Sequence, residues 1–261
     1  MPDIRTQGYV LRVFEYRETS QIAHLLTPDH GNLGVLARGI LGRKRGAQLP
    51  PPLEPFSLLE VYLINRNPES MALLKEGTQI RAYPELQGDV RLLAVASLIF
   101  EVIDKTTEPL KSTRSIFEIA DHLLSALTLP TANPLTICAQ YLMKILEKSG
   151  YQPEMQHCTV CGKTERLEFF SPARGGTVCA ACGKANQGEA IRLDPASRKI
   201  ITRILRSKYA ELQSLKLSAP QSLRILEIAL ALSRYHLTSS QIRSWHFFKT
   251  TAFENLFSGN Q

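Results

Sequence analysis

The sequence contains no run of about 18 or more apolar residues, so it offers no obvious membrane-spanning helix. Residues 1–12 also lack the basic start and apolar stretch of a secretory signal. Apolar residues make up 44% and charged residues 21% of the 261 residues, which excludes wholesale disorder, a collagen-like repeat and a coiled-coil rod. We therefore expect a folded cytoplasmic protein with no membrane partner.

Sequence motifs typical of catalytic sites are missing as well. The chain has no phosphate-binding Gly-x-x-x-x-Gly-Lys-Ser/Thr, no Gly-x-Ser-x-Gly nucleophile turn and no His-Glu-x-x-His zinc-protease motif. Its six histidines are scattered along the sequence. We therefore expect that the protein is not an enzyme.

Acidic residues are scarce in one part of the chain only. The net charge of +7 comes entirely from residues 191–261, which hold 11 basic and 4 acidic residues, whereas residues 1–190 hold 20 of each. A local excess of this size favours a polyanionic partner, and nucleic acid is favoured over a membrane because no tryptophan-rich amphipathic anchor accompanies it. The alternative is a solvated basic face.

Short apolar segments separated by turn residues fill the first eighty residues and predict β-strands. The expected strands are residues 8–16, 21–27, 33–39, 57–65 and 70–80. Five short strands with one long loop predict a small antiparallel barrel, which could be an OB-fold or an SH3-like barrel. The sequence thus predicts a barrel domain over residues 1–80.

From Pro84 onward the apolar period changes to spacings of three and four, which indicates helices. Helices are expected around residues 92–103, 113–127, 134–148, 195–208 and 220–236. We expect one α-helical domain from residues 81–150 and 191–250, interrupted by residues 151–190 and followed by a tail at 251–261. The fold class is therefore α+β with several domains.

The interrupting segment has too few apolar residues to fold unaided, and it holds four of the five cysteines. Cys158-x-x-Cys161 and Cys179-x-x-Cys182 have the spacing of a four-thiolate zinc site, so we expect one structural Zn²⁺ per chain. Gly162 and Gly183 follow the two pairs, where we expect backbone with φ > 0. Two disulfides and a redox or iron–sulfur role are the alternatives. His157 is expected on the surface, and Cys138 in the core.

Two groups of basic residues are candidates for DNA contact. No acidic residue lies between Asp29 and Glu54, a stretch that holds Arg38, Arg43, Lys44 and Arg45 among glycines. In the helix after Pro195, about 60° of arc holds Lys199, Arg203 and Arg206, opposite an apolar face. Both groups suit phosphate contacts without sequence reading, or they are solvated surface.

An aromatic residue beside these cations could also contribute. In the first expected strand, Arg12 and Phe14 alternate onto one face. Phe14 could present a ring for base stacking, or it could pack in the core; Tyr62 in the fourth strand leaves the same choice open.

Several segments together resemble the bacterial recombination-repair mediators of the RecO family. In the N-terminal half the resemblance rests on Arg17-Glu18-Thr19-Ser20-Gln21-Ile22, Leu26-Thr27-Pro28-Asp29-His30-Gly31-Asn32-Leu33, Ala37-Arg38-Gly39 and Leu53-Glu54-Pro55-Phe56. In the C-terminal half, Ser149-Gly150-Tyr151-Gln152-Pro153 precedes the first cysteine pair and Phe170-Ser171-Pro172-Ala173-Arg174-Gly175-Gly176 the second.

The resemblance implies an N-terminal OB-fold, a helical domain and a zinc-binding insertion. It also implies a nucleoid-associated protein that binds single- and double-stranded DNA and anneals complementary strands. Its implied partners are RecR, the single-strand-binding protein and, indirectly, RecA. The alternatives to this function are a zinc-containing transcription factor and a zinc-dependent nucleic-acid enzyme.

Overall fold

The computed structural model describes residues 3–41, 52–64, 70–185, 190–236 and 242–252. The chain divides into two compact units. One unit is Met1–Thr128 together with Ser244–Gln261, and the other is Leu129–Arg243. The domain boundaries expected from the sequence, at residues 80, 150, 190 and 250, stay a prediction.

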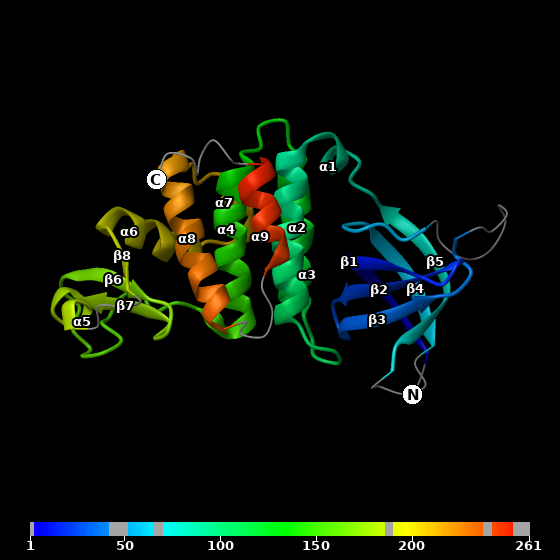
Figure 1. The fold of residues 1–261 in the computed structure, drawn as a ribbon, viewed down its shortest axis with the longest axis horizontal. Helices are drawn as coiled ribbons and strands as arrows, with labels where there is room; N and C mark the ends of the chain where they lie inside the picture. The colour runs from blue at the N-terminus through cyan, green and yellow to red at the C-terminus, as the bar shows by residue number, and fades with distance from the viewer. Residues whose placement is uncertain (1–2, 42–51, 65–69, 186–189, 237–241, 253–261) are drawn as a thin grey trace. The chain divides into compact units, whose positions relative to one another are not determined.

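A closed barrel occupies the N-terminal part of the first unit (Figure 1). Its strands are β1 (Ile4–Tyr16), β2 (Ser20–Thr27), β3 (Gly31–Ala37), β4 (Leu58–Ile64) and β5 (Ala72–Arg81). Their order around the barrel is β1-β2-β3-β5-β4, and all neighbours are antiparallel except β3 and β5. The five predicted strands and the OB-type barrel are therefore confirmed, with a parallel closure that strand alternation cannot predict.

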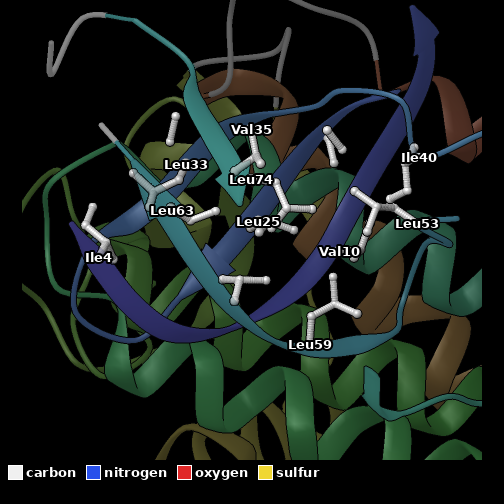
Figure 2. Close-up of a cluster of buried hydrophobic side chains, with 14 residues drawn as sticks. Ile4, Val10, Leu25, Leu33, Val35, Ile40, Leu53, Leu59, Leu63 and Leu74 are labelled. Atoms are coloured by element: carbon white, nitrogen blue, oxygen red, sulfur yellow. The ribbon is translucent and has the colours of Figure 1, made fainter. Parts of the chain in front are cut away.

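Side chains alternate between the barrel interior and its surface, because successive side chains of a strand point to opposite faces of a sheet. A bulge between Val10 and Arg12 of β1 interrupts this alternation once in that strand. Figure 2 shows Val10, Leu25, Leu59 and Leu63 converging in this core, where each is at most 1% exposed. Fully burying a side chain of this kind stabilises the fold by about 1.5–3 kcal/mol. The barrel core thus accounts for the apolar residues that predicted the strands.

Helices complete the first unit. These are α1 (Glu85–Gly88), α2 (Val90–Thr106), α3 (Arg114–Leu127), the short α9 (Arg243–Phe247), whose first residue is counted with the second unit, and a π-type turn η2 (Phe248–Ala252). Helix α2 begins after Asp89, whose side chain accepts a hydrogen bond from the backbone N–H of Arg91 at 2.8 Å. Near its other end, Asp104 is hydrogen-bonded to the barrel residue Asn32. This contact ties α2 to the β2–β3 end of the barrel.

The second unit combines helices with a three-stranded sheet. Its elements are α4 (Pro134–Leu146), the π-type turn η1 (Glu147–Tyr151), β6 (Leu167–Ser171), β7 (Gly176–Cys179), α5 (Ala180–Ala185), β8 (Ile191–Arg192), α6 (Pro195–Arg206), α7 (Tyr209–Leu212) and α8 (Ala219–His236). The strand order is β7-β6-β8, and α4 packs against α8. Each helix expected from the sequence has a counterpart in the structure.

Helix α4 is buried on all sides, so its polar side chains need partners. Gln140 donates to the carbonyl oxygen of Leu215 at 2.7 Å. Lys144 donates to the carbonyl oxygen of Leu205 at 2.7 Å and to the Glu147 carboxylate at 2.9 Å. These bonds hold the C-terminal end of α6 and the loop after α7 against α4.

None of the helices in the described ranges has both the length and the apolar content to cross a membrane.

Candidate metal centre and nucleic-acid surfaces

The first cysteine pair lies in a tight turn before β6. The N–H of Gly162 donates to the carbonyl of Cys158 at 2.8 Å, and the N–H of Cys158 donates to the carbonyl of Lys163 at 2.7 Å. Gly162 has φ +74°, a conformation that favours glycine. The expectation for this position is confirmed, and the turn points both thiols to the same side.

The second pair lies where β7 passes into α5. Cys179 ends the strand and Cys182 lies in the following helix. Gly183 is therefore helical, and the expected positive φ is wrong at this position. The structure gives a different reason for glycine: an added Cβ would lie 2.4 Å from Cδ2 of Phe169. Gly183 lets α5 approach the ring on β6.

All four thiols meet at one point. Their sulfur atoms lie within 4.8 Å of one another, and the Sγ atoms of Cys161 and Cys179 are 3.7 Å apart. Four sulfurs about 2.3 Å from a tetrahedral ion would be separated by roughly 3.8 Å. All five cysteines are free, and 3.7 Å is far longer than the roughly 2.05 Å of a disulfide. The cluster therefore has the geometry of a four-thiolate metal centre.

Two thiols of the cluster differ in how readily they ionise. Burial opposes a thiolate at Cys158, but N–H groups of Cys179, Cys161 and Val160 outweigh it and lower its pKa to about 6. Hydrogen bonding to the Cys179 sulfur is the main cause that raises the pKa of Cys182 to about 12. The two pKa values are thus shifted in opposite directions. A bound cation would favour the thiolate form of both residues.

The segment around the cluster has very little core of its own. Its buried cluster consists of Cys158, Leu167, Val178 and Cys179, with Phe169 and Cys182 packed against it. Half of these six residues are proposed metal ligands. The metal would therefore replace the apolar core that the sequence fails to supply.

Cys138 lies in the core and His157 lies on the surface, as the sequence predicts. Cys138 is fully buried in α4, and burial raises the pKa of its thiol well above the usual value. The His157 side chain is 55% exposed and faces Glu154. Neither belongs to the group of thiols that converge, among the described residues, on one point.

The first basic group is described only in part. Arg38 is exposed in the turn after β3. Its neighbour Gly39 donates from its N–H to Oγ of Ser20 at 3.3 Å, which holds this turn against the start of β2. Arg43, Lys44 and Arg45 lie outside the described residues. Their contact with DNA stays a prediction.

The second basic group lies on one face of α6. Lys199, Arg203 and Arg206 are exposed, whereas Ile201 and Ile204 on the opposite face are fully buried. In the described parts of the chain, no carboxylate forms an ion pair with any of the three cations. This face therefore presents three cations to solvent.

Both ends of α6 are fixed. Asp194 precedes the helix and accepts from the N–H of Ser197 at 2.8 Å, and Pro195 occupies the first turn. The hydroxyl of Ser197 also donates to Asp194 and is the main cause that lowers the pKa of this carboxyl. At the other end, Lys144 holds the Leu205 carbonyl. The cations thus project from a well-anchored helix.

A further surface on the barrel was only partly anticipated. Phe14, Tyr16 and Met71 are 50%, 38% and 54% exposed, although each is a large apolar or aromatic side chain. Of the two places considered for Phe14, the structure shows the surface. Tyr16 and Met71 are not among the candidate contact residues predicted from the sequence. The alternation that placed Arg12 and Phe14 on one face also places Tyr16 there.

Comparison with known proteins agrees with this arrangement of parts. Residues 1–83 match the family model described as Recombination protein O N terminal, and residues 87–246 match Recombination protein O C terminal. A protein of Thermoanaerobacter sp. (strain X514), named DNA repair protein RecO, is 29% identical over 90% of this chain and 92% of its own length. Proteins of the same name from Bacillus velezensis and Bacillus subtilis (strain 168) are 34% and 32% identical, over 68% of each chain.

Proposed function

Because the chain belongs to the recombination protein O (RecO) family, we propose that it is a non-enzymatic DNA-binding mediator of recombinational repair. It binds single- and double-stranded DNA through phosphate contacts and anneals complementary strands in the cytoplasm, at the nucleoid. The proposal assigns contacts to Arg38, Arg43, Lys44 and Arg45 on the barrel unit. In the second unit it assigns them to Lys199, Arg203 and Arg206.

The observation that carries this proposal is the basic face of α6. The second unit holds 16 basic and 8 acidic residues, whereas the remaining residues hold 15 and 16. Within this positive unit, the α6 cations are exposed and the helix is anchored at both ends. Lysine and arginine on a rigid support bind phosphates without reading bases, as annealing of any sequence requires.

We further propose that the four-cysteine centre holds one Zn²⁺, with Cys158, Cys161, Cys179 and Cys182 as ligands. Four thiolates leave no open position for water, which supports a structural role. When bound, the metal would offset two of the four thiolate charges and would cross-link the segment before β6 with the end of β7 and the start of α5. The protein residues supply the rest of the site: N–H groups such as that of Cys179, 3.3 Å from the Cys158 sulfur, donate to the ligands.

The proposed protein partners follow from the family rather than from a described surface. RecR is proposed as a direct partner. The single-strand-binding protein is proposed as the protein that is displaced from DNA, and RecA as the protein that then loads on this DNA. Gel filtration of the chain with purified RecR, alone and with DNA, tests the first of these. Separate elution at micromolar concentrations would contradict a direct complex.

DNA binding is tested by titrating fluorescent oligonucleotides at several salt concentrations. The triple variants Lys199→Ala/Arg203→Ala/Arg206→Ala and Arg43→Ala/Lys44→Ala/Arg45→Ala should each weaken binding and slow annealing. For single strands, each lost phosphate contact should reduce the slope of log affinity against log salt by about 0.7.

The matched control removes three ion-paired cations. Arg91, Lys111 and Arg114 are exposed and pair with Asp89, Glu108 and Asp29. Their triple alanine variant loses the same charge and should bind DNA like the wild type. If the control variant and the test variants bind DNA with equally reduced affinity, the loss reflects net charge alone and the assigned contacts are wrong. A preference on the order of a thousandfold for one sequence would instead favour the transcription factor.

A further inference from the structure

Four adjacent barrel strands carry an outward face that is unusually apolar. Strand pairing defines its members, because residues directly opposite each other share a face. One row contains Arg12, His24 and Gly34, and the next contains Phe14, Ile22, Leu36 and Leu73. Met71 extends the first row, since a Cβ on Gly34 would lie 3.3 Å from its Cγ. Tyr16 lies opposite Ser20 in the third row.

Arginines stack on both aromatic rings of this face. The guanidinium of Arg12 lies 5.3 Å from the centre of the Phe14 ring, and that of Arg17 lies 5.2 Å from the centre of the Tyr16 ring. Such cation–π contacts hold the rings in place while leaving part of each ring in solvent. The face therefore presents two exposed rings at fixed positions.

Asp104 of α2 fixes the position of Arg12. Its carboxylate accepts from Nε of Arg12 at 3.0 Å and lies 3.1 Å from Nδ1 of His24. Because only 9% of the Asp104 side chain is exposed, this carboxylate offers little repulsion to an anion above the sheet. Arg17 and Arg38 form no ion pair among the described residues, so the edge of the face keeps a positive charge.

We propose that this face, called here the ring face (Arg12, Phe14, Tyr16, Arg17 and Arg38), binds single-stranded nucleic acid by stacking bases on Phe14 and Tyr16. Arg17 and Arg38 contact the phosphates. The inference rests on the proposed DNA-binding function and adds that the two surfaces bind different parts of the nucleic acid. The ring face binds unpaired bases, whereas the α6 cations bind phosphates of single or double strands.

The geometry favours a single strand over a duplex. Phe14 and Tyr16 are two residues apart on β1, so their positions along the strand differ by about 6.6 Å. Bases in a duplex follow each other every 3.4 Å or so and are already stacked and paired. A stretched single strand can place separated bases on the two rings. Stacking covers the face of a base and leaves its pairing edge available, which suits annealing.

Charge favours nucleic acid over an apolar protein segment. The carboxylates nearest to the rings in sequence, Glu15 and Glu18, do not belong to these rows; Glu15 lies opposite Gln21 in the alternate set of β1 side chains. Arg12 is paired with Asp104, so Arg17 and Arg38 are the cations of this face without an ion pair among the described residues. This combination of stacking rings and nearby cations is typical of sequence-tolerant single-strand sites.

The test uses the full-length protein and replaces rings at constant apolar bulk. Phe14→Leu and Tyr16→Leu should each weaken single-strand binding at least about fivefold, because stacking contributes about 1–3 kcal/mol per base and 1.4 kcal/mol is tenfold. Duplex affinity should change less than twofold. Phe14→Tyr and Tyr16→Phe keep a ring and should bind like the wild type. Ile80→Ala, at another exposed apolar position on β5, is the matched control.

A second readout detects stacking directly. An oligonucleotide with 2-aminopurine loses fluorescence when that base stacks, so the wild type should quench it and the double leucine variant should not. If the wild type binds no DNA, the proposed function fails. If the double variant binds and quenches like the wild type, DNA binding survives and the ring face is overturned. Unchanged DNA binding with loss of a protein partner would also overturn it, in favour of a protein-docking surface.

Discussion

Gly183 lies directly against the ring of Phe169: a Cβ on this residue would come within 2.4 Å of Cδ2 and 2.8 Å of Cγ. Gly183→Ala should therefore overpack the β6–α5 contact and destabilise the metal-binding segment by about 1–3 kcal/mol. We expect faster transfer of the metal to a coloured chelator and earlier thermal loss of the segment. An alanine variant with wild-type release kinetics would show that the ring moves aside freely.

Replacing each of these glycines by asparagine tests whether steric crowding or backbone conformation is the reason for glycine at that position. Gly162 has φ +74° and open space around it, whereas Gly183 is helical and crowded. Asparagine tolerates positive φ better than other side chains. Gly162→Asn should thus cost little, and Gly183→Asn should cost at least as much as Gly183→Ala. The reverse order would contradict the assignment of the two glycine roles.

Metal removal should unfold one part of the chain only. Purified protein should contain about one zinc per chain, and Cys158→Ser should release it. Because half of the buried cluster of this segment consists of the ligands themselves, chelation should abolish amide protection over residues 153–185. Protection in the barrel should persist, since its core is apolar. Hydrogen exchange with and without chelator measures both.

Iron in place of zinc, or four titratable thiols in fully folded metal-free protein, would contradict the zinc proposal.

Asp104 should make stability depend on acid pH. Its burial raises its pKa, but hydrogen bonds from His24 and Asn32 and the charge of Arg12 prevail and lower it below the usual value. The carboxylate therefore stabilises the fold above its unfolded pKa, about 3.9, and this contribution is lost as pH falls through the lower folded pKa.

The matching variant is Asp104→Asn. It should reduce the free energy of unfolding by about 1.5–3 kcal/mol at pH 7, where a charged acceptor is lost, and by much less near pH 2. Urea unfolding at both pH values measures the difference. Glu118→Gln, at an exposed position on α3, should have little effect at either pH. An equal loss at pH 7 and pH 2 would assign Asp104 a role independent of its charge.

The buried ammonium of Lys144 should be costly to remove. It is 3% exposed and bonds to Glu147 and to the Leu205 carbonyl. Lys144→Met should destabilise the second unit by about 3 kcal/mol, because Glu147 and the carbonyl lose a partner. Glu147→Gln added to Lys144→Met should recover part of this loss. Lys148→Met removes the more exposed partner of Glu147 and should cost at most about 1 kcal/mol. Urea unfolding of these three variants and of Glu147→Gln alone checks this, and strict additivity would contradict a coupled pair.

The sequence predicts those features that depend on neighbours along the chain. Alternation in β1 to β5, periodicity in α2, α3, α4, α6 and α8, and the two Cys-x-x-Cys pairs each reflect a local geometric repeat, and each has its counterpart in the structure. The exposed cations of α6 follow from the same periodicity. Gly162 is a local case too, because its conformation is set by the turn between Cys158 and Cys161.

Features that depend on distant partners could not be predicted. The parallel pairing of Val35 with Ala72 depends on how the barrel closes. The need for glycine at position 183 depends on the ring of Phe169, fourteen residues earlier. The position of the Arg12 side chain depends on Asp104, which lies on another element. Phe14 was ambiguous because alternation assigns a face without saying which face is covered. The solvent-exposed arginine that stacks on it resolves the choice.

The first unit takes residues from both ends of the chain, and this order matters while the protein is being made. Ser244 donates from its N–H to Glu101 of α2 at 2.8 Å, and Phe248 is fully buried in the turn that packs on α2. At about 5–20 residues per second, translation of residues 129–243 delays these contacts by on the order of ten seconds. The barrel can close during that time, but the α2 surface beneath Phe248 stays uncovered until residues 244–252 have left the ribosome. A nascent chain therefore carries an exposed apolar surface on α2 from the synthesis of that helix until this later segment emerges.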